Sequence, residues 1–481
     1  MHLIFLPLLL AGLWLVTCLI QGIRNPIVHV PGPWYARWTR LPAIWYWLTG
    51  QHTQHVQRLH EKYGMSSQAI PYEVDFASIA GAKRIHSFTR PFPKVRLYET
   101  FESGGPNVFS TRDVDLHARW RRLLAGAMSE QSLKTMEQVI QERISFAIEK
   151  LGQIMKENGA ANIFDWWLYM ATDVINELTF GDSMRMLEQG EHNQYFLDLL
   201  SLAAISYLPI IFPNLVKFLS YLPLKLNREV AATRERLGLQ AENSLARYEQ
   251  YVASTPHNRK PTLFDKLVSA TGETLNRDEL KSTAVMYGIA GSDPVAATLT
   301  YLVWAVCRNP GIQAKLVQEL AGLPENYRYE DLKQLPYLNQ VIKETMRVYS
   351  PAPACLKRQV HAEGAEIDGY WIPGGTEVQT QAYSMHRNPA IFPDPERFDP
   401  SRWETPTKDM NDAWMPFGGG SRVCLGLNLA KYMIRSATAK FFRAFPNARV
   451  STRDGFSDDD MEMVIYAVMY PKKHLCLIEA S

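Results

Sequence analysis

The 481-residue sequence predicts a mainly α-helical fold with a minor β part. Two segments, 131–156 and 166–178, carry apolar residues at the three- and four-residue spacing of amphipathic helices. A longer helical pattern runs from Ser282 to Asn309 and contains Pro294. Short strand-like pieces with glycine–proline turns at 368–378 predict a small sheet. Further helices are expected at 335–349 and 427–445, so helices outnumber strands throughout the body.

The overall composition is close to electroneutral. Lys and Arg total 51 against 49 Asp and Glu, a net charge of +2, which excludes a protein that depends on nucleic-acid backbones for binding. No two of the five cysteines stand at C-x-x-C spacing. This argues against a disulfide scaffold and a cysteine-rich zinc site, and it favours a reducing compartment. The cysteines are Cys18, Cys307, Cys355, Cys424 and Cys476.

The N-terminal segment departs from this average. From Leu3 to Ile20 there are 18 residues without a charge, near the lower length limit for crossing a bilayer. No basic residue precedes the run and no small-residue cleavage site follows it, so it predicts an uncleaved anchor rather than a secretory signal. The positive charges follow it, at Arg24, Arg37 and Arg40, which places the body on the cytosolic side. The predicted division is an anchor over 1–23, a stiff proline-rich hinge over 24–33 and one large domain over 34–481.

A second apolar stretch lies between Leu199 and Leu224 and holds a single charge, Lys217. Three prolines interrupt it, so it does not predict another spanning helix. One interpretation is buried core. The other is an apolar access loop that contacts the membrane or an apolar substrate.

The most chemically distinctive segment is FGGGSRVCLG, residues 417–426. Its glycine run permits positive φ and a close approach of the backbone to another group. Cys424 lies just before a predicted helix, where backbone N–H groups and the helix dipole favour a thiolate, and Arg422 adds a nearby cation. Gly426 leaves the first helical turn bare, so a flat group can lie against it. A lone thiolate here suits an axial haem ligand; the alternative is a glycine-rich turn with an incidental cysteine.

Five fixed positions of the pattern F-x-x-G-x-R-x-C-x-G are present: Phe417, Gly420, Arg422, Cys424 and Gly426. The segment resembles the haem-binding loop of the cytochrome P450 family. The resemblance implies the cytochrome P450 fold, with haem b between the long central helix and the cysteine loop. It also implies that Cys424 is the axial ligand of the haem iron.

Other positions extend the resemblance over nearly the whole chain. Glu344 and Arg347 form an E-x-x-R pair on one helix face, and Arg397 in FPDPERFDPSRW completes the expected buried cluster behind the thiolate. In HARWRRLLAGAMS, His117 and Arg121 occupy the positions that contact a haem propionate in the family, and Arg358 resembles the other propionate-binding arginine. The alternative for each cation is a solvated surface charge. A basic rim for docking an acidic reductase is expected from Arg119, Trp120, Arg122, Lys431 and Arg435, with scattered solvated cations as the alternative.

The central helix departs from the family pattern A-G-x-D/E-T-T. Ala290, Gly291 and Asp293 match, but Pro294 replaces the threonine, whose hydroxyl in the family supports proton delivery to bound dioxygen. Thr298, one turn later, would not occupy the same place. Either protons reach the site through Asp293, water or a substrate hydroxyl, or the reaction is oxidative coupling, ring formation or desaturation.

The resemblance therefore implies a haem-thiolate monooxygenase that oxidises an apolar small molecule with O₂ and electrons from NADPH. The electron donor would be NADPH–cytochrome P450 reductase, and the enzyme would be a single-pass protein of the endoplasmic reticulum membrane. The body of the chain resembles fungal members of the family that modify secondary metabolites. A non-catalytic haem-thiolate ligand sensor is the alternative of another class. Expected substrate contacts are Ala290, Gly291 and the segments 101–109, 199–224 and 351–354.

Overall fold

The computed structural model describes residues 2–102, 105–205, 208, 212–254, 260–268 and 275–480. The helices of the N-terminal half are α1 (His2–Ile23), α2 (Leu41–Leu48), α3 (His52–Tyr63), α4 (Ile79–Ile85), α5 (Val114–Ala127), α6 (Glu130–Lys134), α7 (Glu137–Asn158), α8 (Ile163–Phe180), α9 (Met186–Gln189), α10 (Gln194–Ile205) and α12 (Pro213–Ser220). Those that follow are α13 (Lys225–Ser254), α14 (Leu263–Val268), α15 (Arg277–Cys307), α16 (Pro310–Ala321), α17 (Tyr329–Lys333), α18 (Pro336–Val348), α19 (Ala382–Met385), α20 (Lys408–Ala413) and α21 (Leu427–Ala444). The predicted helical class with a minor β part is confirmed.

The strands form four small sheets. They are β1 (Ser66–Ile70), β2 (Glu73–Phe76), β3 (Ala161–Asn162), β4 (Arg358–Gln359), β5 (Ala365–Ile367), β6 (Tyr370–Ile372), β7 (Glu377–Gln379), β8 (Arg449–Val450), β9 (Met463–Ile465), β10 (Met469–Pro471) and β11 (Leu477–Glu479). The largest has the order β1-β2-β7-β4, in which β2 and β7 run parallel and the other neighbours antiparallel. The smaller sheets are β10-β9, β3-β11-β8 and β5-β6.

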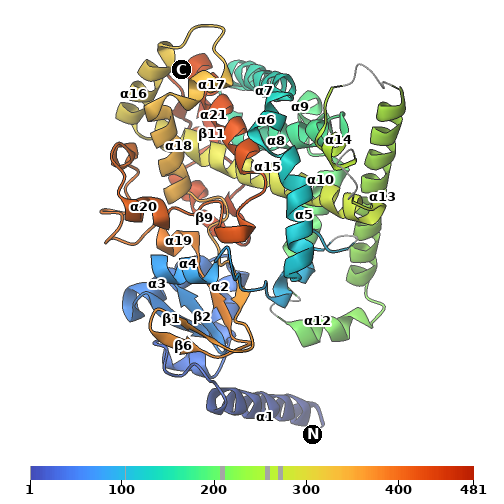
Figure 1. The fold of residues 1–481 in the computed structure, drawn as a ribbon, viewed down its shortest axis with the longest axis vertical. Helices are drawn as coiled ribbons and strands as arrows, with labels where there is room; N and C mark the ends of the chain where they lie inside the picture. Colours follow the sequence, from blue (N-terminus) through green and yellow to red (C-terminus); the bar gives the residue numbers. More distant parts are fainter. Residues whose placement is uncertain are drawn as a thin grey trace.

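Helix α15 runs through the centre of the body (Figure 1) and packs against α8, α18 and α21. A capping box starts it, because Asn276 and Glu279 each accept a hydrogen bond from the other's backbone N–H. From Val295 to Cys307 nearly every side chain is buried. The predicted single helix containing Pro294 is confirmed, although it begins five residues earlier and ends two residues earlier than the pattern indicated.

The other predicted elements are largely confirmed, with one correction. Segments 166–178, 335–349 and 427–445 coincide with α8, α18 and α21, and 368–378 holds β6 and the start of β7. The predicted helix over 131–156 is two helices, α6 and α7, because the chain turns at Thr135 and Met136. Leu133, just before this turn, and Met136, within it, are both buried, so the apolar spacing continues across the turn.

The N-terminal helix α1 leaves the body at the end of the molecule where α12 also lies (Figure 1). Among the described residues, the one helix long and apolar enough to cross a membrane is α15, and 67% of its apolar window is buried in the body. Residues 24–33 form no helix, as their prolines predict, yet Ile27 and Val30 are buried against the largest sheet. The division at residues 23/24 and 33/34 stays a prediction.

The apolar stretch around α12 lies on the surface, which contradicts the buried-core interpretation for its described part. The predicted stretch also includes residues 206, 207 and 209–211, which lie outside the described residues. Exposed apolar side chains here are Leu215, Phe218, Tyr221, Leu222, Leu224 and Leu226. The access-loop interpretation therefore remains.

Candidate functional site

The loop that precedes α21 is shaped by its glycines. Gly418 and Gly420 have φ of +72° and +63°, a region that favours glycine. A Cβ at Gly420 would also overlap the carbonyl oxygen of His86, so only glycine fits between this loop and the end of α4. The loop closes where the Cys424 N–H donates to the Phe417 carbonyl at 2.9 Å.

Cys424 follows the glycine turn. Its side chain is accessible, although protein atoms surround much of it. Burial raises the pKa of its thiol, while the Gly426 N–H and the Arg121 guanidinium lower it. The neighbouring groups thus act in the predicted direction, but burial outweighs them. A Cβ at Gly426 would meet no atom within 4 Å, so the surface beside the sulfur is open, as a flat ligand requires.

Five cationic or basic side chains gather around this loop: Lys94, His117, Arg121, Arg358 and Arg422. None of them forms an ion pair with an acid anywhere in the described part of the chain. Lys94, His117 and Arg358 are buried, and Arg422 has two buried guanidinium nitrogens, Nε and one Nη, without a hydrogen-bond partner. Burial and the Arg358 charge lower the pKa of Arg422 to about 10. The cluster therefore lacks an anion.

These features fit a haem. Cys424 offers the iron ligand, Gly426 a flat contact, and the basic cluster a place for two carboxylates. Arg121 donates to the Val423 carbonyl at 2.7 Å, and Arg358 lies against the Tyr98 hydroxyl at 3.3 Å. The structure brings these predicted residues together, and their contact with haem stays a prediction. Lys94 was not predicted, since its setting RPFPKVR carries no recognisable spacing.

Glu344 lies at the centre of a buried polar cluster behind the loop. Its two oxygens accept from Arg347 Nε and Nη2, Arg402 Nε, the Trp403 indole and the Asp399 N–H, each at 2.9 Å. The prediction that Arg397 supplies the second arginine is corrected, because Arg402 makes that ion pair. Arg397 contributes its backbone carbonyl, which accepts from Arg347 at 3.1 Å. FPDPERFDPSRW contains both arginines, and the pattern alone gave no reason to choose the second.

His386 joins this cluster to the chain just before the cysteine loop. Its Nε2 accepts the Met415 N–H at 2.9 Å, so its Nδ1–H donates to the Arg347 carbonyl at 3.0 Å. Burial lowers the pKa of His386 to about 3, which keeps the imidazole neutral. No motif marked this histidine in the sequence.

The middle of α15 presents an accessible face. Ile289 is 39% exposed, Ala290 is exposed, and Gly291, Asp293 and Pro294 are partly buried, whereas the helix beyond them is buried. Residues 290, 293 and 294 share one helix face. The Tyr470 hydroxyl on β10 donates to Asp293 Oδ2 at 2.7 Å. Burial raises the pKa of Asp293 to about 6, and the Tyr470 hydrogen bond opposes that rise.

Two other predicted substrate segments, 101–109 and 351–354, contact α15 at Ser282 and β10 at Met469, respectively. Phe101 and Phe109 meet edge to face with ring centroids 5.8 Å apart; residues 103 and 104 between them lie outside the described range. The Met469 N–H on β10 donates to the Pro351 carbonyl at 3.0 Å, which fixes the C-terminal hairpin beside segment 351–354.

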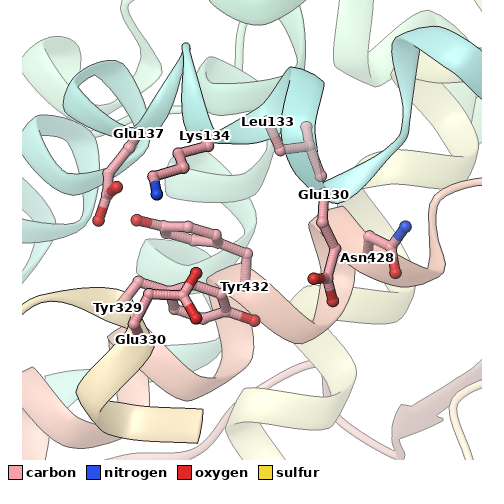
Figure 2. Close-up of a pocket in the computed structure, with 8 residues that line it drawn as sticks. All are labelled: Glu130, Leu133, Lys134, Glu137, Tyr329, Glu330, Asn428 and Tyr432. Carbon is pink, nitrogen blue, oxygen red and sulfur yellow. The ribbon is translucent and has the colours of Figure 1, made fainter.

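The predicted basic rim is not continuous. Trp120 is buried, and its indole N–H and the Arg119 guanidinium both donate to Glu279. Arg435 donates to Asn339 and to the Tyr329 hydroxyl. Arg122 is exposed and Lys431 is partly exposed. The adjoining pocket carries three carboxylates around the stacked rings of Tyr329 and Tyr432 (Figure 2); its lining is Glu130, Leu133, Lys134, Glu137, Tyr329, Glu330, Asn428 and Tyr432.

Comparison with known proteins decides the family. The family model described as Cytochrome P450 matches residues 31–475. The chain belongs to the cytochrome P450 family. Cytochrome P450 monooxygenase orf2 of Aspergillus niger is 38% identical over 481 residues, which cover 99% of this chain and 98% of that protein. Cytochrome P450 monooxygenase tazI of Aspergillus terreus is 40% identical and covers 96% of each chain. Cytochrome P450 monooxygenase aflV of Aspergillus parasiticus is 32% identical over 98% of this chain and 96% of that one.

This cytochrome P450 is therefore an oxidoreductase with a haem iron cofactor, and it uses O₂, a redox partner and a substrate. The recognition made from the thiolate loop is confirmed. The family also sets aside the non-catalytic sensor, since these relatives are named as monooxygenases.

Proposed function

We propose that this cytochrome P450 is a haem b-thiolate monooxygenase that oxidises an apolar small molecule in fungal secondary metabolism. The observation that carries the proposal is the combination of an accessible Cys424 with a basic cluster that has no acidic partner in the described chain. The fungal relatives named as monooxygenases support the reaction class. The apolar substrate follows from the apolar, accessible face at Ile289 and Ala290.

The bound haem iron supplies the chemistry of O₂ activation and oxygen transfer. Cys424 would hold the iron through its sulfur, with the Gly426 N–H directed at that sulfur. Arg358, Arg422 and the other members of the basic cluster would hold the haem carboxylates. The accessible face of α15 at Ile289 and Ala290 orients the substrate. Asp293 holds or releases a proton at its carboxyl group.

The reduced-CO difference spectrum tests the ligand. Wild type shows the thiolate-type band, Cys424→Ala loses it, and Cys18→Ala, the matched control in α1, keeps it. A pyridine haemochrome spectrum identifies haem b. If wild type lacks the thiolate-type band, the proposal fails.

The second candidate is oxidative coupling, cyclisation or desaturation without net oxygen insertion. Pro294 favours it, because the central helix lacks the hydroxyl that supports proton delivery in the family. Comparison of metabolites from a deletion strain and its parent identifies the substrate and product. Product formed under ¹⁸O₂ then separates the candidates: a monooxygenase product carries the label, and a coupled or desaturated product does not.

The electron donor in this proposal is NADPH–cytochrome P450 reductase, and the site of action is the endoplasmic reticulum membrane. The apolar α1 and the exposed apolar residues of α12, at one end of the molecule (Figure 1), support a membrane-facing end. Exposed Arg122 offers a cation for reductase docking. Reconstitution of the full chain with that reductase tests the donor, since NADPH oxidation then depends on both proteins.

A further inference from the structure

We propose that Tyr470 is a positioning residue for Asp293, and that it supplies from β10 the hydroxyl partner that position 294 of the central helix lacks. This inference rests on the proposed function. The Tyr470 hydroxyl donates to Asp293 Oδ2 at 2.7 Å, between residues 177 positions apart. Among the described residues, Tyr470 is the side chain that donates a hydrogen bond to Asp293, the carboxylate on the accessible face of α15.

The helix itself offers Asp293 no such partner. Pro294 has neither a hydroxyl nor an N–H, so it also leaves the Ala290 carbonyl without its helical donor. The neighbouring hydroxyls are engaged within the helix: Ser292 donates to the Gly288 carbonyl at 2.8 Å, and Thr298 donates to the Pro294 carbonyl at 2.7 Å. A donor for Asp293 therefore has to come from another element.

Contacts with several elements fix the position of the Tyr470 side chain beside Asp293. It pairs with Val464 across the β9–β10 hairpin, and its ring meets Phe164 edge to face at 6.3 Å and His474 at 5.1 Å. The preceding residue, Met469, is hydrogen-bonded to Pro351. The hydroxyl is thus fixed by α8, the hairpin and the Pro351 segment together.

The geometry assigns different tasks to the two carboxyl oxygens. Oδ2 is occupied by Tyr470, and no described residue hydrogen-bonds Oδ1. With Oδ2 fixed, Oδ1 is the oxygen that gives a proton to water on the α15 face and regains one from bulk water. No electron changes place in this exchange. Tyr470 sets the rotamer and the acidity of the carboxyl group, and so acts through Asp293.

Infrared spectroscopy of the full chain tests the contact without depending on turnover. The Asp293 carboxyl band is the one that Asp293→Asn removes. Tyr470→Phe should shift this band because one hydrogen bond is lost, and Tyr466→Phe, the matched control in the same hairpin, should not. An unshifted band in Tyr470→Phe overturns the proposal.

A double-mutant cycle tests the function of the contact. In full chain reconstituted with reductase, Tyr470→Phe should lower the rate of NADPH oxidation about tenfold, the rate equivalent of one hydrogen bond. In the Asp293→Asn background the same change should have no further effect. An equal loss in both backgrounds means that Tyr470 acts independently of Asp293 and overturns the proposal. A wild type without the thiolate-type CO band instead refutes the proposed function, and the infrared result still stands.

Discussion

Glu344 and Arg402 form an ion pair of 2.9 Å across 58 residues of chain, and both side chains are almost completely buried. The pair joins α18 to the segment that follows FPDPERFDP. Together with Arg347 and Trp403 it satisfies both oxygens of the carboxylate, which a buried charge requires. His386 links this cluster to Met415, just before the cysteine loop.

The first prediction separates the two arginines of that segment. Arg402→Ala should lower the free energy of unfolding by about 2 kcal/mol, because it removes a hydrogen bond to a buried charge. Arg397→Ala keeps the backbone carbonyl that Arg347 uses, so it is the control and should change stability little. Urea unfolding followed by circular dichroism measures both. Equal losses would contradict the assignment of Arg402.

The second prediction concerns two glycines of the loop. Gly420→Ala should destabilise the fold, since its Cβ overlaps the His86 carbonyl and its φ is positive. Gly426→Ala should leave the melting temperature of the haem-free chain unchanged, because nothing lies within 4 Å of its Cβ, and should lower haem content. Thermal unfolding and haem absorbance give the two readouts. Normal haem content in Gly426→Ala would count against a haem face at that residue.

The third prediction concerns the basic cluster. Burial and the charges of Arg358 and Arg422 lower the pKa of Lys94 well below its usual value. Lys94→Met should therefore raise the melting temperature of the haem-free chain, since it removes a buried repulsion. The same variant should lose haem faster to an acceptor protein. Lys83→Met, at a surface ion pair, is the control. Faster haem loss without any gain in haem-free stability would refute the repulsion argument.

The fourth prediction is a pH dependence. The pKa of Asp293 is about 6 in the fold, above the ordinary value for aspartate, because of burial. The folded state then binds more protons between these two values, so stability is present below pH 4 and is lost as pH rises through 6. Asp293→Asn should raise the melting temperature more at pH 7.5 than at pH 4. The opposite order would show that the carboxyl is not destabilised by burial.

The fifth prediction places α12 at the membrane. In full chain reconstituted into vesicles, Phe218→Trp should gain fluorescence that brominated lipids quench. Leu239→Trp on α13 is equally suited as a control, since Leu239 is 57% exposed and Phe218 61%. Its added fluorescence should resist quenching. Equal quenching at both positions, or at neither, would contradict a specific α12 contact.

Local patterns in the sequence carried much of the fold and the chemistry of the loop. The long helix with Pro294, the helices α18 and α21, and the cysteine loop all have periodicities or fixed spacings within one segment. The β1 and β2 strands were not predicted, because SSQAI shows no alternation of apolar and polar residues and EVDF alternates over only four residues.

The parts that could not be predicted depend on contacts between distant segments. Lys94 joins the basic cluster, and Tyr470 reaches Asp293, only through tertiary packing. The choice of Arg402 over Arg397 depends on how the chain turns after Pro400, and no spacing in the motif encodes that turn. These three contacts carry no recognisable signature in a single sequence.

The Glu344 cluster and the basic cluster differ in what each needs in order to form. Every polar atom around Glu344 finds its partner within the polypeptide, and His386 extends that closed set to Met415. Two nitrogens of Arg422, Nε and one Nη, find none. Assembly should therefore have an order: the scaffold behind the loop matures during chain folding, and the loop acquires its final rigidity when the prosthetic group arrives. A chain made under haem starvation would remain a partly ordered apoprotein that can still bind haem later.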